Sequence, residues 1–293
     1  MTDASREARP SALILGLGYT GRTIARDLLA QGWRVTGTGR DRPNATSGPA
    51  GVETLVFHTE TGEGFEAVRE RAAKCDLLIS SVPPLPSGAD PVLTGLPGLR
   101  THARAVIYLS ATSVYGDRGG DWVFEAETPR PLSYRGRARV EAELRWLETG
   151  WPVHVLRLAG IYGPGRSAFS KLDRAVVKPD HVVNRIHVDD IAALVSAIAH
   201  GPRPGIYNVA DGHPAPPDEV VRFAAGLAGA PAPREVAWTD PGLSAMARSF
   251  YAETKRVDAS RARAAFGWEP RFGDYRSGLR AVWEAERAGG TGG

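Results

Sequence analysis

An apolar segment that runs into a glycine-rich turn constrains this chain of 293 residues more than any other feature. Residues 12–15 read Ala-Leu-Ile-Leu, and residues 16–21 read Gly-Leu-Gly-Tyr-Thr-Gly. Apolar residues at helical spacing follow at once, as far as Leu29. A strand, a Gly-x-Gly-x-x-Gly turn and a helix in this order are typical of the unit that binds dinucleotides in α/β proteins.

The three glycines of this turn have separate expected roles. Gly16 allows the backbone to turn sharply, and Gly18 leaves room for the main chain to approach a pyrophosphate. Gly21 allows the helix to pack closely against the strand. The free N–H groups at the start of the helix then face the phosphates. A plain glycine-rich loop is the alternative, and the flanking strand and helix make it the weaker interpretation.

The composition narrows the class of protein. The 36 basic and 33 acidic residues give a net charge of +3 without a separate basic block, so we expect no nucleic-acid partner. The single cysteine, Cys75, excludes an internal disulfide, and the histidines show no metal-ligand spacing, so no metal site is expected. No apolar segment has membrane-spanning length, and residues 1–10 contain no signal-peptide core. These features predict a cytoplasmic protein with a small-molecule substrate and no membrane partner.

The order of apolar and amphipathic segments predicts an α/β fold. Strands are expected at residues 12–15, 34–38, 54–57, 77–82, 105–109 and 153–158. Helices are expected between them at residues 20–31, 63–74 and 137–149. Near-continuous apolar strands that alternate with helices indicate a Rossmann-type, doubly wound parallel sheet. Two stretches rich in glycine or proline, residues 39–51 and 83–98, are expected to be mainly loop.

The pattern changes after about Gly160, which predicts a smaller C-terminal lobe for the substrate. Short strands are expected there at residues 182–183, 206–209 and 235–237, and helices at residues 190–200, 218–227, 258–266 and 275–287. The predicted domains are an NAD(P)-binding domain at residues 11–160, to whose sheet later segments can return, a substrate-binding lobe at residues 161–288, and flexible tails at residues 1–10 and 289–293.

The end of the second strand bears on the choice of cofactor. NAD-selective sites usually carry a carboxylate there, which accepts hydrogen bonds from the ribose hydroxyls. This strand ends in Gly39 and Arg40 instead, and a guanidinium can hold the 2′-phosphate of NADP. The sequence therefore favours NADP over NAD. Two alternatives stay open: Asp41 reaches the ribose after a shift of one residue, or Arg40 and Arg42 are solvated loop residues.

Several later segments resemble one family in sequence order. The landmarks are residues 108–117 (YLSATSVYGD), 156–165 (LRLAGIYGPG), 184–192 (NRIHVDDIA), 206–209 (IYNV), 255–258 (KRVD) and 267–270 (GWEP). Together with the opening turn they resemble the extended short-chain dehydrogenase/reductases, the group of the nucleotide-sugar epimerases and dehydratases. The best fit is an atypical, YeeZ-like branch of that superfamily. The resemblance covers residues 12–283.

The resemblance implies further cofactor-binding residues and a catalytic group. Tyr19 and Thr20 stand where backbone N–H groups contact the pyrophosphate, and Ser80, Ser81 and Val82 end the fourth strand beside the cofactor. In this family a tyrosine exchanges a proton with a hydroxyl or carbonyl of the substrate. A lysine four residues later lowers the pKa of that tyrosine, and a serine or threonine at the end of the fifth strand binds the same substrate oxygen.

The catalytic positions depart from the family pattern. Tyr134 matches the tyrosine, whereas Ala138 stands at the lysine position and Ala111 at the hydroxyl position. Thr112 is the candidate for a displaced hydroxyl. We therefore predict Tyr134 and Thr112 as the catalytic residues of a degenerate Ser-Tyr-Lys site.

A displaced positive charge is expected from Arg137 or Arg139. An arginine can stabilise a phenolate, but it cannot relay a proton because its pKa exceeds about 12. The competing interpretation is a basic helix start at which Tyr134 only lines a cleft.

Two functions stay open at this point. The first is an NADP-dependent oxidoreductase or epimerase/dehydratase that acts on a hydroxyl or carbonyl substrate of the sugar-nucleotide kind. The second is a catalytically inactive NADP-binding sensor or regulator. Extended members of the family often dimerise through two long helices, and the first of these falls in the broken stretch before Thr101. We therefore predict a monomer or a weak homodimer.

Overall fold

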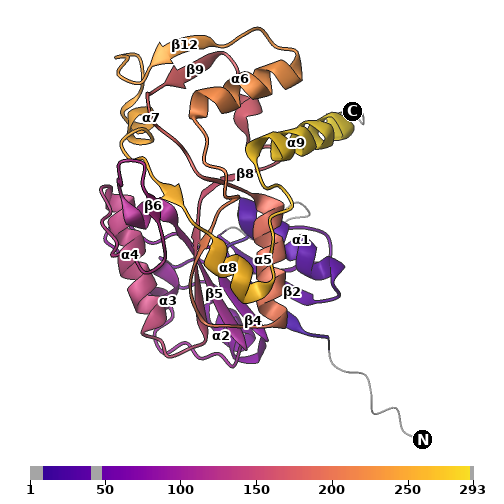
Figure 1. Ribbon diagram of the computed structural model, residues 1–293. Helices are drawn as coiled ribbons and strands as arrows, with labels where there is room; N and C mark the ends of the chain where they lie inside the picture. Colours follow the sequence, from indigo (N-terminus) through magenta and orange to yellow (C-terminus); the bar gives the residue numbers. More distant parts are fainter. Residues whose placement is uncertain (1–8, 41–47, 291–293) are drawn as a thin grey trace, which may run out of the picture. The chain divides into compact units, whose positions relative to one another are not determined.

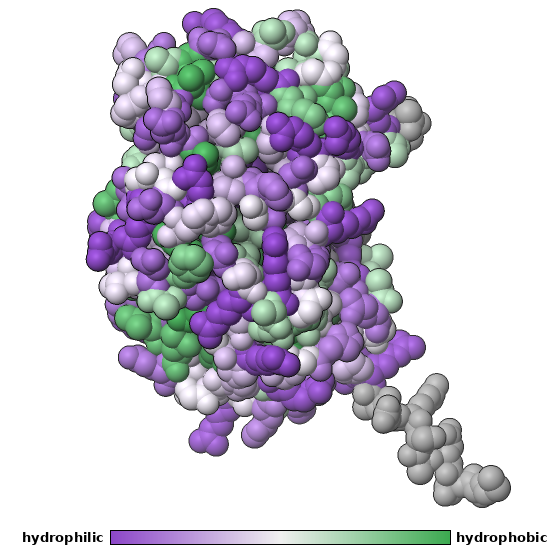
Figure 2. Space-filling view, in the orientation of Figure 1, coloured by the Kyte–Doolittle hydropathy of each residue, from purple (hydrophilic) through white to green (hydrophobic). Residues whose placement is uncertain are grey.

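The computed structural model describes residues 9–40 and 48–290. The predictions for residues 1–8 and 291–293 of the two tails, and for Asp41 and Arg42, lie outside the described residues. Across the part that is described, no helix has the length and apolar character needed to cross a membrane. On the face drawn in Figure 2, hydrophobic residues lie in separate patches among hydrophilic ones.

A seven-stranded sheet is the centre of the fold (Figure 1). Its strands are β1 (Ser11–Leu15), β2 (Arg34–Gly39), β3 (Glu53–Val56), β4 (Leu77–Ser80), β5 (Ala105–Ala111), β7 (Val153–Leu158) and β11 (Gly205–Val209). They are ordered β11-β7-β5-β4-β1-β2-β3, and the pairs from β5 to β3 are parallel. In the register of β1, Ile14 lies between Gly37 and Ile79. The predicted Rossmann-type α/β fold is confirmed.

The remaining elements are short strands and the helices. The strands pair two by two and are β6 (Trp122–Val123) with β13 (Arg256–Val257), β8 (Gly160–Tyr162) with β10 (Arg185–His187), and β9 (Arg174–Val177) with β12 (Arg234–Ala237). The helices are α1 (Tyr19–Ala30), α2 (Phe65–Lys74), α3 (Pro91–Gly95), α4 (Tyr134–Leu147), α5 (Val188–His200), α6 (Pro217–Ala228), α7 (Ala245–Ser249), α8 (Ser260–Phe266) and α9 (Tyr275–Gly290), with 3₁₀ turns η1 (Thr112–Tyr115) and η2 (Ala168–Ser170).

Two short strands differ from the sequence prediction. Residues 206–209, which we expected in the small lobe, belong to β11 of the central sheet. Residues 182–183 form no strand, because Val183 makes only an isolated bridge with Ala215. Pro214 and Pro216 flank Ala215 and have no N–H group, so the ladder cannot extend beyond this one pair.

Two connections also differ in detail. Strand β4 ends at Ser80, so Ser81 and Val82 follow the strand instead of ending it. The stretch at residues 83–98, expected to be mainly loop, contains the five-residue helix α3. Asp90 makes this helix possible, since its carboxylate accepts hydrogen bonds from the N–H groups of Val92 and Leu93 at 2.9 and 3.1 Å.

The chain forms two compact units that interleave along the sequence. The first comprises the described residues up to Leu109 together with Glu141–Val155 and Ala192–Gly205. The second comprises Ser110–Val140, Leu156–Ile191 and the residues from Ile206 onward. The predicted domain boundary between residues 160 and 161 stays a prediction.

Each unit has its own buried centre. In the first, the buried ring of Trp146 stacks on Tyr108 at 5.6 Å, and its Nε1 donates to Asp90 Oδ2 at 2.8 Å. In the second, α6 packs against β9, η2 and α9 around the buried Tyr162 and Leu279, and Figure 1 shows α6 beside β9 and α9.

Candidate functional site

The glycine-rich turn of the first unit has the geometry that a dinucleotide cradle requires. Gly16 has a φ of +95°, a backbone conformation that residues with a Cβ atom rarely adopt. A Cβ atom on Gly21 would lie 2.3 Å from the carbonyl oxygen of Gly16, so only glycine allows α1 to start this close to β1. The expected roles of both glycines agree with these positions.

The start of α1 carries backbone N–H groups that no side chain caps. Gly18 is the N-cap residue, no side chain caps the helix, and its first turn contains no acidic residue. A Cβ atom on Gly18 would meet no atom within 4 Å, so the space in front of the helix is open. Backbone N–H groups at a helix start bind anions well, and the residues present therefore fit the pyrophosphate of a dinucleotide. Tyr19 is half-buried and Thr20 is buried at this start.

Neighbouring strand ends fix the turn. The N–H of Gly16 donates to Thr38 Oγ1 at 3.0 Å, and the N–H of Ser81 donates to the carbonyl of Leu15 at 2.8 Å. Val82 follows directly, and a Cβ atom on Gly16 would lie 3.4 Å from its side chain. The structure therefore brings Gly16 together with Ser81 and Val82, as the sequence predicts.

Ser80 and Arg40 occupy different environments in the same unit. Ser80 is fully buried, and its hydroxyl has no hydrogen-bond partner among the residues described. Arg40 is exposed directly after β2, and no acidic residue lies between Arg34 and Arg40. The end of β2 thus presents a guanidinium to solvent.

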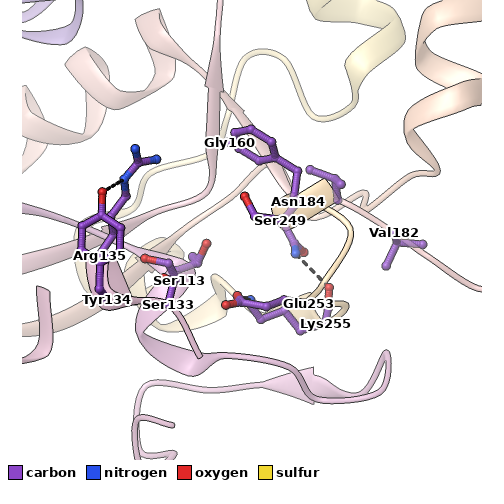
Figure 3. Close-up of a pocket in the computed structure, with 13 residues that line it drawn as sticks. Ser113, Ser133, Tyr134, Arg135, Gly160, Val182, Asn184, Ser249, Glu253 and Lys255 are labelled. Carbon is purple, nitrogen blue, oxygen red and sulfur yellow. Dashed lines mark hydrogen bonds and ion pairs between the residues drawn. The ribbon is translucent and has the colours of Figure 1, made fainter. Parts of the chain in front are cut away.

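The second unit contains a pocket of about 480 Å³ that holds both predicted catalytic residues (Figure 3). Its walls are formed by Thr112, Ser113, Ser133, Tyr134, Arg135, Gly160, Val182, Val183, Asn184, Ser249, Phe250, Glu253 and Lys255. Five of these residues carry hydroxyl groups and two are cations, so the pocket suits a polar, oxygen-rich ligand.

Tyr134 is the first residue of α4 and is 51% exposed. Its phenol oxygen accepts a hydrogen bond of 3.1 Å from Arg135 Nε, and Figure 3 shows the hydroxyl turned towards that guanidinium. Arg137, one of the two arginines expected to supply a positive charge, donates instead to the carbonyl of Leu132 at 3.0 Å. Ala138 is buried. The cation that contacts the phenol is therefore the residue next to it in sequence.

Thr112 and Ser113 enter the pocket from η1, which begins directly after β5. A buried network holds this turn: Tyr115 Oη donates to Asn208 Oδ1 at 2.7 Å and accepts from Arg157 Nη1 at 2.9 Å. Burial raises the pKa of Tyr115, which keeps the phenol neutral. Tyr115 is thus a structural residue that positions the hydroxyls of Thr112 and Ser113.

None of the known protein-family models matches the chain. The chain is 32% identical over 222 residues to Protein YeeZ of Escherichia coli (strain K12), and the match covers 69% of this chain and 78% of that protein. The chain belongs to the YeeZ-like branch of the atypical short-chain dehydrogenase/reductases. The family prediction is confirmed.

Two solved structures are similar to the chain over nearly its whole length. A conserved protein of unknown function from Silicibacter pomeroyi is 41% identical, with a TM-score of 0.84 over 94% of this chain and 99% of that one. A Methylobacillus flagellatus protein, provisionally named an NAD-dependent epimerase/dehydratase, is 28% identical, with a TM-score of 0.73 over 95% of this chain and 99% of that one. The YeeZ-like chain thus shares its fold with the epimerase/dehydratase superfamily.

The pocket of this YeeZ-like chain contains residues that the sequence did not single out. Arg135, Ser113, Glu253 and Lys255 line it in addition to the predicted pair. Lys255 begins the KRVD landmark at residues 255–258 and lies directly before β13. No signal in the sequence placed it in one pocket with Thr112.

The expectation that the chain has no metal site stays a prediction. Among residues 9–40 and 48–290, no group of three or more His, Cys, Asp or Glu side chains is arranged to hold a metal ion. Cys75 is buried, and burial raises the pKa of its thiol to about 11, so the thiolate is scarce at neutral pH.

Proposed function

We propose that the chain is a nicotinamide-dinucleotide-dependent oxidoreductase or epimerase/dehydratase that acts on a hydroxyl or carbonyl substrate. The observation that carries the proposal is the uncapped start of α1 with open space at Gly18. The same chain carries an oxygen-rich pocket with an accessible phenol at Tyr134. The name of the Methylobacillus flagellatus relative, an NAD-dependent epimerase/dehydratase, supports this class of cofactor and reaction.

The proposed cofactor is NADP in preference to NAD. A bound nicotinamide would supply reversible hydride exchange, and Gly16, Gly18, Tyr19, Thr20 and Gly21 would hold its pyrophosphate through backbone N–H groups. The exposed guanidinium of Arg40 supports a contact with a 2′-phosphate, since it matches the fork geometry of that group. Ser80, Ser81 and Val82 would form the neighbouring wall.

The proposed acid/base residue is Tyr134. Its phenol would exchange a proton with the hydroxyl or carbonyl oxygen of the substrate, and Thr112 would donate a hydrogen bond to the same oxygen. Arg135 would stabilise the phenolate form through its hydrogen bond of 3.1 Å. Because an arginine does not release its proton, the proton lost by Tyr134 must go to substrate or solvent and cannot pass along Arg135.

Hydride exchange by the purified protein tests this proposal. NADPH oxidation is followed in the steady state with a panel of aldehydes, ketones and keto sugars, and the best substrate is then given to Tyr134→Phe. We expect turnover to fall by about 100-fold or more, as is usual when a general acid is removed. Tyr207→Phe, at a buried tyrosine outside the pocket lining, is the matched control. Full activity in Tyr134→Phe contradicts the assignment of the acid/base residue.

A second candidate function is a nucleotide-binding sensor without chemistry. The buried Ala138, which leaves the phenol without the family's lysine, favours it. In this case NADPH binds, no member of the substrate panel turns over, and the bound cofactor changes the affinity for another macromolecule. Any measurable steady-state turnover argues against the sensor.

A further inference from the structure

Lys255 is a buried ammonium in the wall of the pocket that contains Tyr134 and Thr112. The residue is 7% exposed. Its Nζ donates to the carbonyl oxygen of Gly116 at 2.8 Å and to Glu253 Oε2 at 2.8 Å. An ammonium has three N–H donors, so these two contacts leave one donor for a ligand.

The backbone around this ammonium is fixed from two sides. Asn184 Nδ2 donates to the carbonyl of Lys255 at 2.9 Å, and Asn184 Oδ1 accepts from the N–H of Val257 at 2.8 Å. Gly116 follows η1 directly, so the same lysine is tied to the turn that carries Thr112. Lys255 is therefore held in one position relative to the pocket wall instead of sampling many rotamers.

The residues that line the pocket include more cations than carboxylates, which favours an anionic ligand. Its lining contains two cations, Arg135 and Lys255, and a single carboxylate, Glu253. Burying an ammonium is costly unless its donors are satisfied, and one carboxylate with one carbonyl oxygen satisfies only two of them. In Figure 3, Glu253 and Lys255 lie together across the pocket from Tyr134, whose hydroxyl faces Arg135. The lysine is thus available to a ligand independently of the phenol.

We propose that Lys255 binds an oxyanion of the substrate, a carboxylate or a phosphate, and that Glu253 is the carboxylate with which this anion competes for the ammonium. The inference rests on the proposed function only in taking this pocket as the substrate site. It deepens that function by naming the substrate class: a hydroxyl or carbonyl compound with an anionic group. In this proposal Lys255 does not take over the role of the family's lysine, whose position is Ala138. It lies far from that position in sequence, and it binds the substrate instead of the tyrosine.

Lysine-selective NMR tests the proposal without any variant at the site. The chain has only four lysines, at positions 74, 171, 178 and 255. Protein labelled at the lysine side chains therefore gives four ammonium environments, and Lys74→Arg, Lys171→Arg and Lys178→Arg assign Lys255 by elimination. The probes are sodium phosphate and sodium acetate, titrated separately at constant ionic strength. Lys178 is the internal control, because its Nζ donates to the carbonyl of Tyr251 and lies 4.8 Å from the Trp238 ring.

We expect a saturable shift of the Lys255 signals with at least one probe and no saturable shift of Lys178. Saturation with phosphate alone assigns a phosphate-bearing substrate, and saturation with acetate assigns a carboxylate. If neither probe gives a saturable shift of Lys255, the proposal is wrong. Because nicotinamide binding is measured separately by calorimetry, this failure is distinguishable from a failure of the proposed function.

Two variants separate anion binding from a purely structural role. Lys255→Met should weaken binding of the effective probe about tenfold, since a hydrogen bond to a charged group is lost, while Lys255→Arg keeps part of the affinity. Glu253→Gln should tighten binding several-fold, because it removes the carboxylate that competes with the anion. Equal or weaker binding in Glu253→Gln contradicts the proposal. Lys178→Met, at a lysine outside the lining of this pocket, is the control for the loss of a positive charge.

Discussion

At the scale of single residues, we propose that Arg40 selects between the two nicotinamide cofactors. It is the exposed cation after β2, where an NAD-selective site carries an acid. Arg40→Ala should raise the Kd for NADPH about 10- to 100-fold and leave that for NADH nearly unchanged, since only the 2′-phosphate contact is lost. Calorimetric titration of both cofactors measures this. Arg34→Ala, at the opposite end of the same strand, is the control.

The opposite result at this position is informative. If Arg40→Ala weakens the binding of NADH and NADPH equally, or changes the binding of neither, then Arg40 is a solvated loop residue and the predicted preference for NADP is wrong.

Gly21 carries a prediction about stability rather than binding. A Cβ atom there would lie 2.3 Å from the carbonyl oxygen of Gly16. Because this oxygen belongs to the backbone, it can move away only at a cost in free energy. Gly21→Ala should lower the free energy of unfolding by about 1–3 kcal/mol, as overpacking does. Gly226→Ala in α6, where a Cβ atom would meet nothing within 4 Å, should instead be neutral or raise it by up to about 1 kcal/mol. Urea unfolding of both variants checks the difference in sign.

At the scale of elements, one carboxylate organises the short helix α3. Asp90 is fully buried, and it accepts from the N–H groups of Val92 and Leu93 and from Trp146 Nε1. Asp90→Ala leaves three donors without this acceptor, of which those of Val92 and Trp146 are buried, and should lower the free energy of unfolding by about 2–4 kcal/mol. Ser244→Ala, which removes the exposed cap of the equally short α7, should cost no more than about 1 kcal/mol. Equal losses in chemical denaturation would refute the role of Asp90.

Helix α3 also shows why some elements could be predicted from the sequence and others could not. Segments such as α1 and β1 show a clear spacing of apolar residues in the sequence itself. Their bounds were therefore predicted to within one residue. Helix α3 is too short to show a period, and its stability depends on Trp146, more than fifty residues away in sequence. The bridge at Val183 failed as a strand because its partner lies between two prolines, which local sequence around Val183 does not report.

At the scale of the whole molecule, a buried acid makes stability depend on pH. Burial raises the pKa of Asp211 to about 7, far above its value of about 3.9 in an unfolded chain. Its contribution to stability is therefore complete below about pH 4 and is lost as the pH rises through about 7. Relative to Asp211→Asn, the wild-type free energy of unfolding should fall by about 1–4 kcal/mol between pH 4 and pH 8.

Urea denaturation of both proteins across this range measures the effect. Asp211→Asn keeps an acceptor for the N–H of His213, which donates to Asp211 Oδ1 at 2.9 Å, so it tests the charge and not the contact. A constant difference between the two proteins at all pH values contradicts the raised pKa.

The assembly state is a further prediction at this scale. Helix α3, in the stretch where we expect the family's first dimerisation helix to be short or lost, has only five residues. We expect a monomer or a weak homodimer by light scattering at low micromolar concentration. A tight dimer under these conditions contradicts the prediction.

The candidate site was predictable only in part, and the reason is the distance in sequence between its members. Gly16, Gly18 and Gly21 stand in one short motif whose backbone requirements are local, so their positions could be derived. The contacts of the pocket residues could not: Arg135, the next residue in sequence, bonds the phenol of Tyr134 where Arg137 or Arg139 was expected. Lys255 reaches Gly116 across more than a hundred residues, and this contact depends on tertiary packing, which no local pattern encodes.

Isothermal titration calorimetry with NADPH and NADH tests the central claim, that the start of α1 binds a dinucleotide, most directly. Wild type should bind at least one cofactor with a saturable heat, and NADPH more tightly than NADH. Gly18→Val should abolish that heat and leave the thermal unfolding midpoint nearly unchanged, because its side chain would enter the open space where we place the pyrophosphate. No saturable heat with either cofactor, or an unchanged affinity in Gly18→Val, would contradict the account.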